Sequence, residues 1–199
     1  MTADYVRRQI LTAIRVARFG NNAVNEFDQS FEGFYRSFIG IALGVPLFAV
    51  IVLTQHRMAA AIAAEGVTDA LPSGAQFQIL EWLGYAANWL ALPLAMIAIA
   101  RVIGAAKRYV PFVVAYNWGN VFVLGLSVIP YLVFLAGLVP VVGVALLYYP
   151  VAIFALAYHW RVARDGLQVP GVTAAGIVLF DITLSLVIAG ATSRLAMAL

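Results

Sequence analysis

The sequence predicts an all-α membrane protein, a polytopic bundle of five transmembrane helices preceded by an amphipathic interfacial helix. Hydrophobic residues make up 64% of the 199 residues, and only 12 basic and 9 acidic side chains are present. A soluble domain of this length would carry roughly a quarter charged residues, about 50. Too few charges are therefore available to cover a soluble surface. Intrinsic disorder is excluded as well, because it requires low hydrophobicity and high net charge.

Uncharged stretches long enough to cross a bilayer define the five spans. A spanning helix needs about 20 apolar residues, and stretches without Asp, Glu, Lys or Arg occupy residues 37–56, 82–100 and 109–160. The third stretch is long enough for two helices with a turn near residues 138–140, and a fifth apolar stretch follows Pro170. The predicted transmembrane domain covers residues 37–199, with spans at about 37–56, 79–101, 110–137, 140–161 and 170–193.

Residues 1–36 are predicted to form a cytoplasmic segment that contains the amphipathic helix. Over residues 3–20, four arginines fall within an arc of roughly 100°. A helix of this kind lies in the headgroup layer, where anionic lipid attracts each basic residue by about 1 kcal/mol. The same pattern would suit a docking helix for a cytoplasmic partner. The arginines expected to contact lipid or a partner are Arg7, Arg8, Arg15 and Arg18, and the apolar stripe comprises Val6, Ile10, Ala13 and Ala17.

The basic residues predict the orientation of the spans. In a five-span chain, all Lys and Arg residues except Arg57 and Arg194 fall on the side of the N-terminus. The positive-inside rule then places the N-terminus in the cytoplasm and the C-terminus outside. The expected location is a bacterial inner membrane.

A carboxyl group near the membrane midplane is the most informative polar residue. Asp181 lies 11 residues beyond Pro170, which corresponds to about 16 Å along a helix. A carboxyl there costs about 2.5 to 3.5 kcal/mol to insert, so we expect it to face protein or water and to be able to carry a proton. Counting residues along the second and third spans brings three asparagines within about two helical turns of this depth. The predicted buried polar cluster is Asp181, Asn117, Asn120 and Asn88.

Three roles are open for this cluster. It could hold helices together, since hydrogen bonds between membrane helices contribute about 0.6 to 2 kcal/mol each. It could instead be a proton or ion site, or it could contact a specific partner. No duplicated segment of the kind found in many transporters is visible. Gly40 and Gly44 form a GxxxG pattern that lets another helix approach closely, in the same chain or in a second copy.

The sequence lacks the patterns expected of enzymes and metal sites. It has no cysteine, and its two histidines, His56 and His159, are predicted at opposite faces of the membrane, so they cannot share a metal or haem. Ser127 lacks the closing glycine of a nucleophile elbow, and no GxxxxGK, GxGxxG or HExxH occurs. We therefore expect no enzymatic activity, no cofactor and no metal. Nucleic acid is not an expected partner, because orientation in the membrane explains the pI of 9.4.

Two short segments and the overall hydropathy profile resemble a known family. The segments are Phe31-Glu-Gly-Phe-Tyr-Arg-Ser-Phe38, which leads into Pro46, and Ala115-Tyr-Asn-Trp118. With the polar N-terminal tail, five spans and very short outer tail, they resemble the Yip1-domain membrane proteins, which have bacterial and eukaryotic members. The DLYGP motif of the eukaryotic members is absent and only Gly84-Tyr85 is similar to their glycine-tyrosine motif, so binding of small GTPases is not implied. The resemblance implies a five-span membrane protein and no particular activity.

These observations predict a non-enzymatic membrane scaffold or accessory protein, which organises membrane or stabilises a larger membrane complex. Its contact surface would be the arginine helix and the aromatic residues between positions 27 and 38. The alternative is a small proton- or ion-coupled transporter that uses Asp181 at the midplane. The expected partners are the lipid bilayer, including anionic lipids, and a membrane protein complex.

Overall fold

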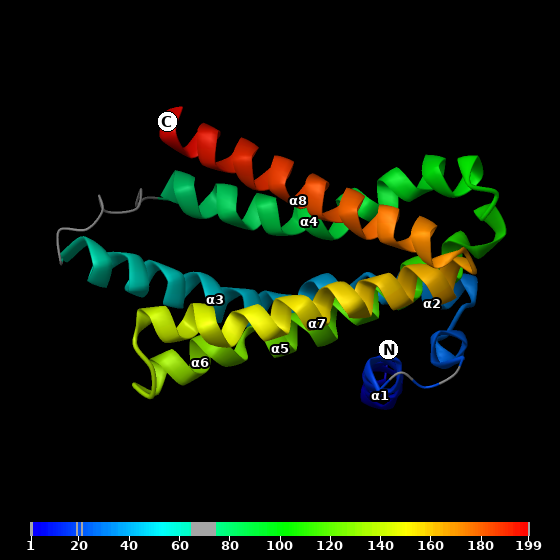
Figure 1. Cartoon of the computed structure of the whole chain (residues 1–199), viewed down its shortest axis with the longest axis horizontal. Helices are drawn as coiled ribbons and strands as arrows, with labels where there is room; N and C mark the ends of the chain where they lie inside the picture. Colours follow the sequence, from blue (N-terminus) through cyan, green and yellow to red (C-terminus); the bar gives the residue numbers. More distant parts are fainter. Residues whose placement is uncertain (1, 19, 21, 65–74, 199) are drawn as a thin grey trace.

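The computed structural model describes residues 2–18, 20, 22–64 and 75–198, and within these ranges the chain is all α-helical with no strand (Figure 1). Five helices in the described ranges are long and apolar enough to cross a membrane, which confirms the predicted five-span bundle. The spans are Phe31–Ala64, Gln76–Val102, Ala106–Leu135, Val141–Leu167 and Gly171–Ala196.

Several helices run past the predicted span ends. The largest extensions cover residues 57–64 and 162–167, because backbone hydrogen bonding continues beyond the first charged residue, where a hydropathy count stops. In chain order the elements are α1 Ala3–Ala17, η1 Ala23–Glu26, α2 Phe31–Ser37, α3 Ile39–Ala64, α4 Ala75–Val102, η2 Ala106–Arg108, α5 Tyr109–Ser127, α6 Ile129–Leu135, α7 Val141–Leu167 and α8 Gly171–Ala198.

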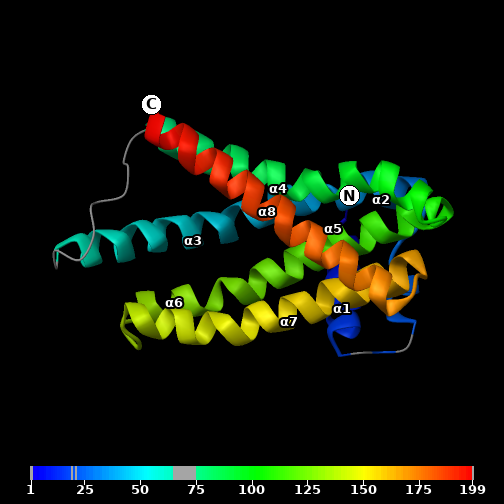
Figure 2. The same ribbon diagram turned by 45° about the horizontal axis from the view of Figure 1, so that its top comes forward.

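The helices are arranged around α5. Helices α4 and α8 lie side by side in both ribbon views, while α5, α6 and α7 form the other side of the bundle (Figures 1 and 2). Every residue from Pro111 to Gly119 is buried, because α1, α2, α3, α4 and α7 all contact α5. The central helix is therefore enclosed by protein along most of its length, and polar groups on it must find partners on its neighbours.

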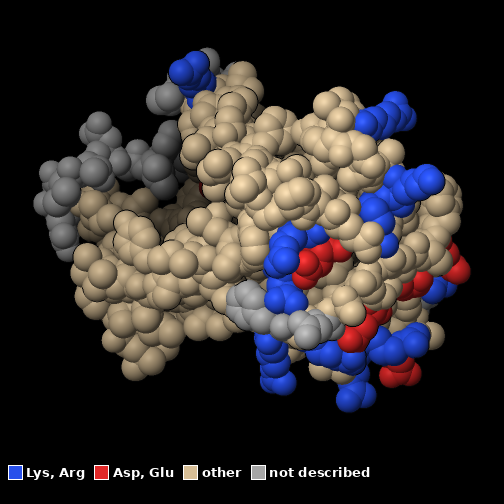
Figure 3. Space-filling view, turned by 45° about the vertical axis from the view of Figure 1, so that its right-hand side comes forward, with Lys and Arg blue, Asp and Glu red and all other residues tan. Residues whose placement is uncertain are grey.

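One end of the bundle carries most of the charged residues. Helix α1, the connection from α4 to α5 and the connection from α7 to α8 lie there, whereas α8 finishes at the opposite end (Figure 1). Figure 3 shows Lys and Arg side chains gathered with Asp and Glu at this end, which we call the basic end. Its basic residues are Arg7, Arg8, Arg15, Arg18, Arg36, Arg101, Lys107, Arg108, Arg161 and Arg164.

Helix α1 packs on protein along its buried face. Tyr5, Ala13 and Val16 are at most 5% exposed, and the ring of Tyr5 meets the edge of Trp118 with centroids 6.2 Å apart. The hydroxyl of Tyr158 donates to the carbonyl oxygen of Ala13 at 3.4 Å. Burial raises the pKa of Tyr5 to about 12. The apolar stripe of α1 thus packs against the helical core, while Arg7, Arg8, Arg15 and Arg18 lie on the exposed face.

Arginine side chains connect the N-terminal segment to the bundle. Nε of Arg108 donates to the carbonyl oxygen of Gly166, and its guanidinium also donates to Oδ1 of Asn25, both at 3.0 Å. The guanidinium of Arg161 donates to the carbonyl oxygen of Gly20. Part of the positive charge at the basic end therefore holds the fold together, in addition to any role at the membrane surface.

The GxxxG pattern is used for packing inside the chain. A Cβ at position 44 would overlap the hydroxyl oxygen of Tyr85 and lie 3.0 Å from Leu124, and one at position 40 would lie 3.0 Å from Trp89. The close approach allows Tyr85 to donate from its hydroxyl to the carbonyl oxygen of Ile41 at 2.7 Å. Gly40 and Gly44 therefore let α3 approach α5 closely and make room for the aromatic side chains of α4.

Replacing Gly44 by Ala is expected to lower the stability of the bundle. The added methyl group must displace Tyr85, and overpacking of this kind costs about 1 to 3 kcal/mol. Thermal unfolding in detergent, followed by circular dichroism, measures the loss as a lower midpoint. Gly190→Ala in α8 is the matched control, since nothing lies within 4 Å of a Cβ there. Equal midpoints for the two variants would contradict the proposed packing.

Candidate functional site

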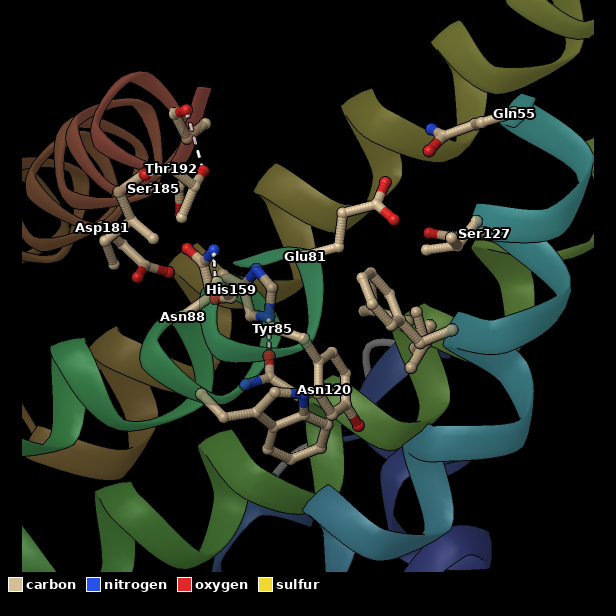
Figure 4. Close-up of a pocket in the computed structure, with 18 of the residues that line it drawn as sticks. Gln55, Glu81, Tyr85, Asn88, Asn120, Ser127, His159, Asp181, Ser185 and Thr192 are labelled. Atoms are coloured by element: carbon tan, nitrogen blue, oxygen red, sulfur yellow. Dashed lines mark hydrogen bonds between the residues drawn. The ribbon is translucent and has the colours of Figure 1, made fainter. Parts of the chain in front are cut away.

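A cavity of about 420 Å³ lies between α3, α4, α5, α7 and α8 (Figure 4). Its walls are largely apolar, but polar side chains from all five helices reach it. This volume is in the range of cavities that hold small molecules. The polar lining residues labelled in Figure 4 are Gln55, Glu81, Tyr85, Asn88, Asn120, Ser127, His159, Asp181, Ser185 and Thr192.

Asp181 and Tyr116 line the part of the cavity that is nearest the basic end. The hydroxyl of Tyr116 lies 3.2 Å from Oδ1 and 3.4 Å from Oδ2 of Asp181, and it donates to the carboxyl group. Tyr116 is held in place by stacking on Phe112, with ring centroids 5.8 Å apart. Asp181 lies 10 residues after Gly171, about 15 Å along α8 from the basic end. That this position is the membrane midplane stays a prediction.

His159 and Asn120 form a second polar pair beside this carboxyl group. Nε2 of His159 lies 2.9 Å from Oδ1 of Asn120. Because an amide oxygen can only accept, the imidazole donates from Nε2 in this arrangement. The His159 ring also lies against the ring of Tyr116, with centroids 5.6 Å apart. Figure 4 shows Asp181 and His159 reaching the same part of the cavity from α8 and α7.

Asn88 contributes an acceptor to the cavity. Its Nδ2 donates to the carbonyl oxygen of Gly84 at 3.0 Å, one turn earlier in α4. Its Oδ1 is buried and has no hydrogen-bond partner among the described residues. A buried amide oxygen without a donor is costly. Asn88 therefore places an unsatisfied acceptor in the wall of the cavity.

A histidine and a glutamate lie together where the cavity approaches the opposite end. Nε2 of His56 on α3 is 3.2 Å from Oε1 and 3.1 Å from Oε2 of Glu81 on α4. Glu81 lies 21 residues before Val102, about 31 Å along α4 from the basic end. The cavity therefore extends from mid-depth toward the end opposite the basic residues.

A much smaller void lies on the other side of Asp181. Its volume is about 10 Å³, close to the least space that holds a water molecule. Asp181, Tyr116 and His159 line both the void and the larger cavity, and the remaining lining residues of the void are apolar. These three side chains form the boundary between the cavity and the part of the bundle nearer the basic end.

Three of the four residues of the predicted polar cluster lie together at the cavity. Asp181, Asn120 and Asn88 line the cavity, but Asn117 is fully buried elsewhere, and its Nδ2 donates to Oγ of Ser37 at 2.9 Å. The reason is the rotation of α5, because Tyr116 and Asn120 are four residues apart on one face, whereas Asn117 is turned by about 100° from Tyr116. Asn117 connects α5 to α2 and takes no part in the cavity.

Two side chains that lie beside Asp181, those of Tyr116 and His159, were not part of the predicted cluster. Tyr116 could have been found because it lies four residues before Asn120, on the same helical face. His159 was predicted at a membrane face because the fourth span was ended near Trp160. Helix α7 continues to Leu167, eight residues beyond His159, so His159 lies about 12 Å inside the end of the helix. Within the described ranges, no three His, Asp or Glu side chains form a group that could hold a metal ion.

No family model matches the chain, and neither a curated protein nor a solved structure matches it. The resemblance to Yip1-domain proteins stays a prediction. Functional reasoning therefore depends on the geometry of the cavity.

Single cysteines are expected to distinguish the cavity from the lipid-facing surface. The chain has no cysteine, so each variant carries a single thiol. Ser185→Cys lines the cavity, and a water-soluble cationic methanethiosulfonate added at the end opposite the basic residues should modify it. Thr183→Cys is the control, since position 183 is turned by about 200° from Asp181 on α8 and lies outside the lining. Mass spectrometry measures the modification, and equal rates at the two positions would contradict a water-accessible cavity.

Proposed function

We propose that this protein is a small membrane transporter that binds a polar solute in the cavity and couples its movement to a proton carried by Asp181. The observation that supports this proposal is that no asparagine of the predicted cluster donates a hydrogen bond to Asp181. If the carboxyl group served only to hold helices together, their amide groups would be expected to donate to it. Instead Asn117 donates to Ser37 and Asn88 donates to Gly84.

The carboxyl group of Asp181 thus has acceptor capacity that the described part of the protein does not use. Among the described residues, Tyr116 is its hydrogen-bond donor, while the rest of the carboxyl group faces a cavity of solute size. A carboxyl group in such surroundings is stable when it is protonated, or when its carboxylate form is paired with a cation or accepts several hydrogen bonds. A group that alternates between a proton and another ligand is what coupling of a solute to a proton requires.

Transport also requires access from both ends, and the helices contain sites at which they can bend. Pro46 in α3, Pro93 in α4 and Pro150 in α7 each lie inside a helix, where proline removes a backbone hydrogen bond and favours a kink. We infer that bending at these positions opens the boundary formed by Asp181, Tyr116 and His159 toward the basic end.

The charge distribution supports one orientation for this activity. Under the positive-inside rule, the basic end faces the cytoplasm and the cavity opens to the outside, as expected for a protein of a bacterial inner membrane. The proposed activity moves a solute without changing it chemically. It therefore requires no enzyme chemistry and no cofactor.

A scaffold or accessory role is the second candidate, and exposed residues at the basic end favour it. Phe31 and Tyr35 are 69% and 62% exposed, and Arg7, Arg8 and Arg18 lie on the outer face of α1. Aromatic and arginine side chains are typical of both membrane interfaces and protein contacts. In this role the same surface would bind anionic lipid or a membrane protein complex.

Replacing Asp181 by Asn is expected to abolish solute movement driven by a pH gradient, because an amide cannot take up and release the proton. Proteoliposomes under an imposed pH gradient are incubated with a mixture of small cationic, neutral and anionic solutes, and uptake is measured by mass spectrometry. The wild-type protein should accumulate one of these classes only while the gradient persists.

Asp4→Asn is the matched control, because Asp4 is an exposed carboxylate in the first turn of α1. This variant should retain gradient-driven uptake. Uptake that persists in the Asp181→Asn protein, or that is missing from the wild-type protein, would refute the transport proposal.

Replacing Arg7, Arg8, Arg15 and Arg18 together by Gln tests the basic surface. Each lost charge removes about 1 kcal/mol of attraction to anionic lipid, so fewer anionic phospholipids should remain bound after mild-detergent purification. Native mass spectrometry counts them. Arg57→Gln with Arg194→Gln, at the opposite end, should leave the count unchanged. An unchanged count for the four-residue variant would remove lipid contact from the role of α1.

A further inference from the structure

The titratable side chains of the described cavity lining include carboxyl groups and a histidine but no basic Lys or Arg. Asp181 and Glu81 both line it, and no Lys or Arg is among the described lining residues. Across the whole chain basic residues outnumber acidic ones by 12 to 9, so the acidic lining is opposite to the overall balance. A cavity with carboxyl groups and no guanidinium or ammonium groups repels anions and favours cations.

Several hydrogen-bond donors in the cavity are already used by the protein itself. The hydroxyl of Tyr85 donates to Ile41, that of Tyr116 donates to Asp181, and that of Thr192 donates to the backbone of its own helix. The side-chain amide of Gln55 donates to Tyr131. The Nε2 donor of His159 is likewise occupied by Asn120.

Acceptors, in contrast, remain available. The buried Oδ1 of Asn88 has no donor among the described residues, and the hydroxyl oxygen of Thr192 keeps its lone pairs after donating. The carboxyl group of Asp181 has acceptor capacity beyond the bond from Tyr116. A ligand that supplies hydrogen-bond donors or positive charge would complement these acceptors, whereas the carboxyl groups of the lining would repel an anion.

Aromatic rings form one wall of the cavity. Phe48, Tyr85 and Trp89 all line it. The rings of Phe48 and Tyr85 stack with centroids 4.5 Å apart, and the ring of Trp89 meets that of Tyr85 at an angle of 63° with centroids 6.1 Å apart. Aromatic faces attract organic cations, tryptophan most strongly. The wall therefore suits the apolar part of an amine or quaternary ammonium compound as well as its charge.

We propose that the solute is a small organic cation, an amine or a quaternary ammonium compound, which Asp181 binds in competition with a proton. Binding converts the protonated carboxyl group to a carboxylate paired with the cation, and the released proton leaves to solvent. Uptake of a proton reverses the exchange and releases the cation. The step from binding to transport rests on the proposed function, but the binding itself does not.

Several titratable groups face this exchange site from neighbouring helices. Tyr116 on α5 contacts the Asp181 carboxyl group directly, and His159 on α7 lies beside it. Glu81 on α4, paired with His56 on α3, lies nearer the opposite end. The cation therefore passes a second carboxylate before it reaches Asp181.

Binding of benzyltrimethylammonium to the full chain in detergent tests the proposal, with phenylacetate as an anionic probe of similar size. Isothermal titration calorimetry at alkaline pH should detect the cation and not the anion. Asp181→Asn is expected to weaken cation binding about thirtyfold or more, and Trp89→Leu to weaken it about fivefold. Asp4→Asn should bind like the wild-type protein, and circular dichroism verifies that each variant is folded.

A measurement on the unmodified protein complements the variants. In weakly buffered solution, adding benzyltrimethylammonium should release protons in proportion to the cation bound. The apparent affinity should fall as the pH is lowered, because protons compete for the same carboxyl group. Binding of phenylacetate in place of the cation, cation binding without proton release, or unchanged cation binding by Asp181→Asn would each overturn the proposal.

The outcome is separable from that of the transport experiment. Gradient-driven uptake of a neutral or anionic solute that depends on Asp181 would refute the cation assignment and leave the transport proposal standing. Cation binding with proton release, combined with no uptake by proteoliposomes, would support the assignment and refute transport.

Discussion

The burial of α5 is the constraint on which the rest of the structure depends. A helix surrounded by protein inside a membrane must satisfy its polar side chains on neighbouring helices, because neither water nor lipid can do so. Three polar residues within little more than one turn of α5 are directed to three different elements. Tyr116 donates to Asp181 on α8, Asn117 donates to Ser37 on α2, and Asn120 accepts from His159 on α7. One helix thereby sets the relative rotation of its neighbours.

This division of partners determines the chemistry of the cavity. Asn117 donates to Ser37 and Asn120 accepts from His159, so the carboxyl group of Asp181 has a phenol as its donor and open space beside it. The same pairing places His159 at the boundary of the cavity. The polar side chains therefore line a cavity and do not simply bond to one another. The proposed exchange of a proton for a solute at Asp181 depends on this arrangement.

The two ends of the bundle differ in the polar contacts that join their helices. At the basic end, Arg108 donates to the carbonyl oxygen of Gly166 in the last turn of α7, and Arg161 on α7 donates to that of Gly20 in the N-terminal segment. Arginine side chains therefore connect α7 to both the N-terminal segment and the connection between α4 and α5. Among the described residues nearer the opposite end, polar contacts between helices include the pair of His56 with Glu81 and that of Gln55 with Tyr131. The arginine contacts to the N-terminal segment are made at the basic end.

The sequence alone determined the number of apolar helices long enough to span a membrane and the position of Asp181 along its helix, because hydropathy and the rise per residue are local properties that act along the helix axis. It could not determine which residues meet across the bundle. The spans are apolar on almost every side, so their periodicity does not reveal which face is turned inward. That rotation was decided by tertiary packing, through the glycine contacts of α3 and the polar partners of α5. It removed Asn117 from the predicted cluster and added Tyr116 and His159 to the cavity. A rotation of about 100° about the axis leaves every depth unchanged and replaces every contact.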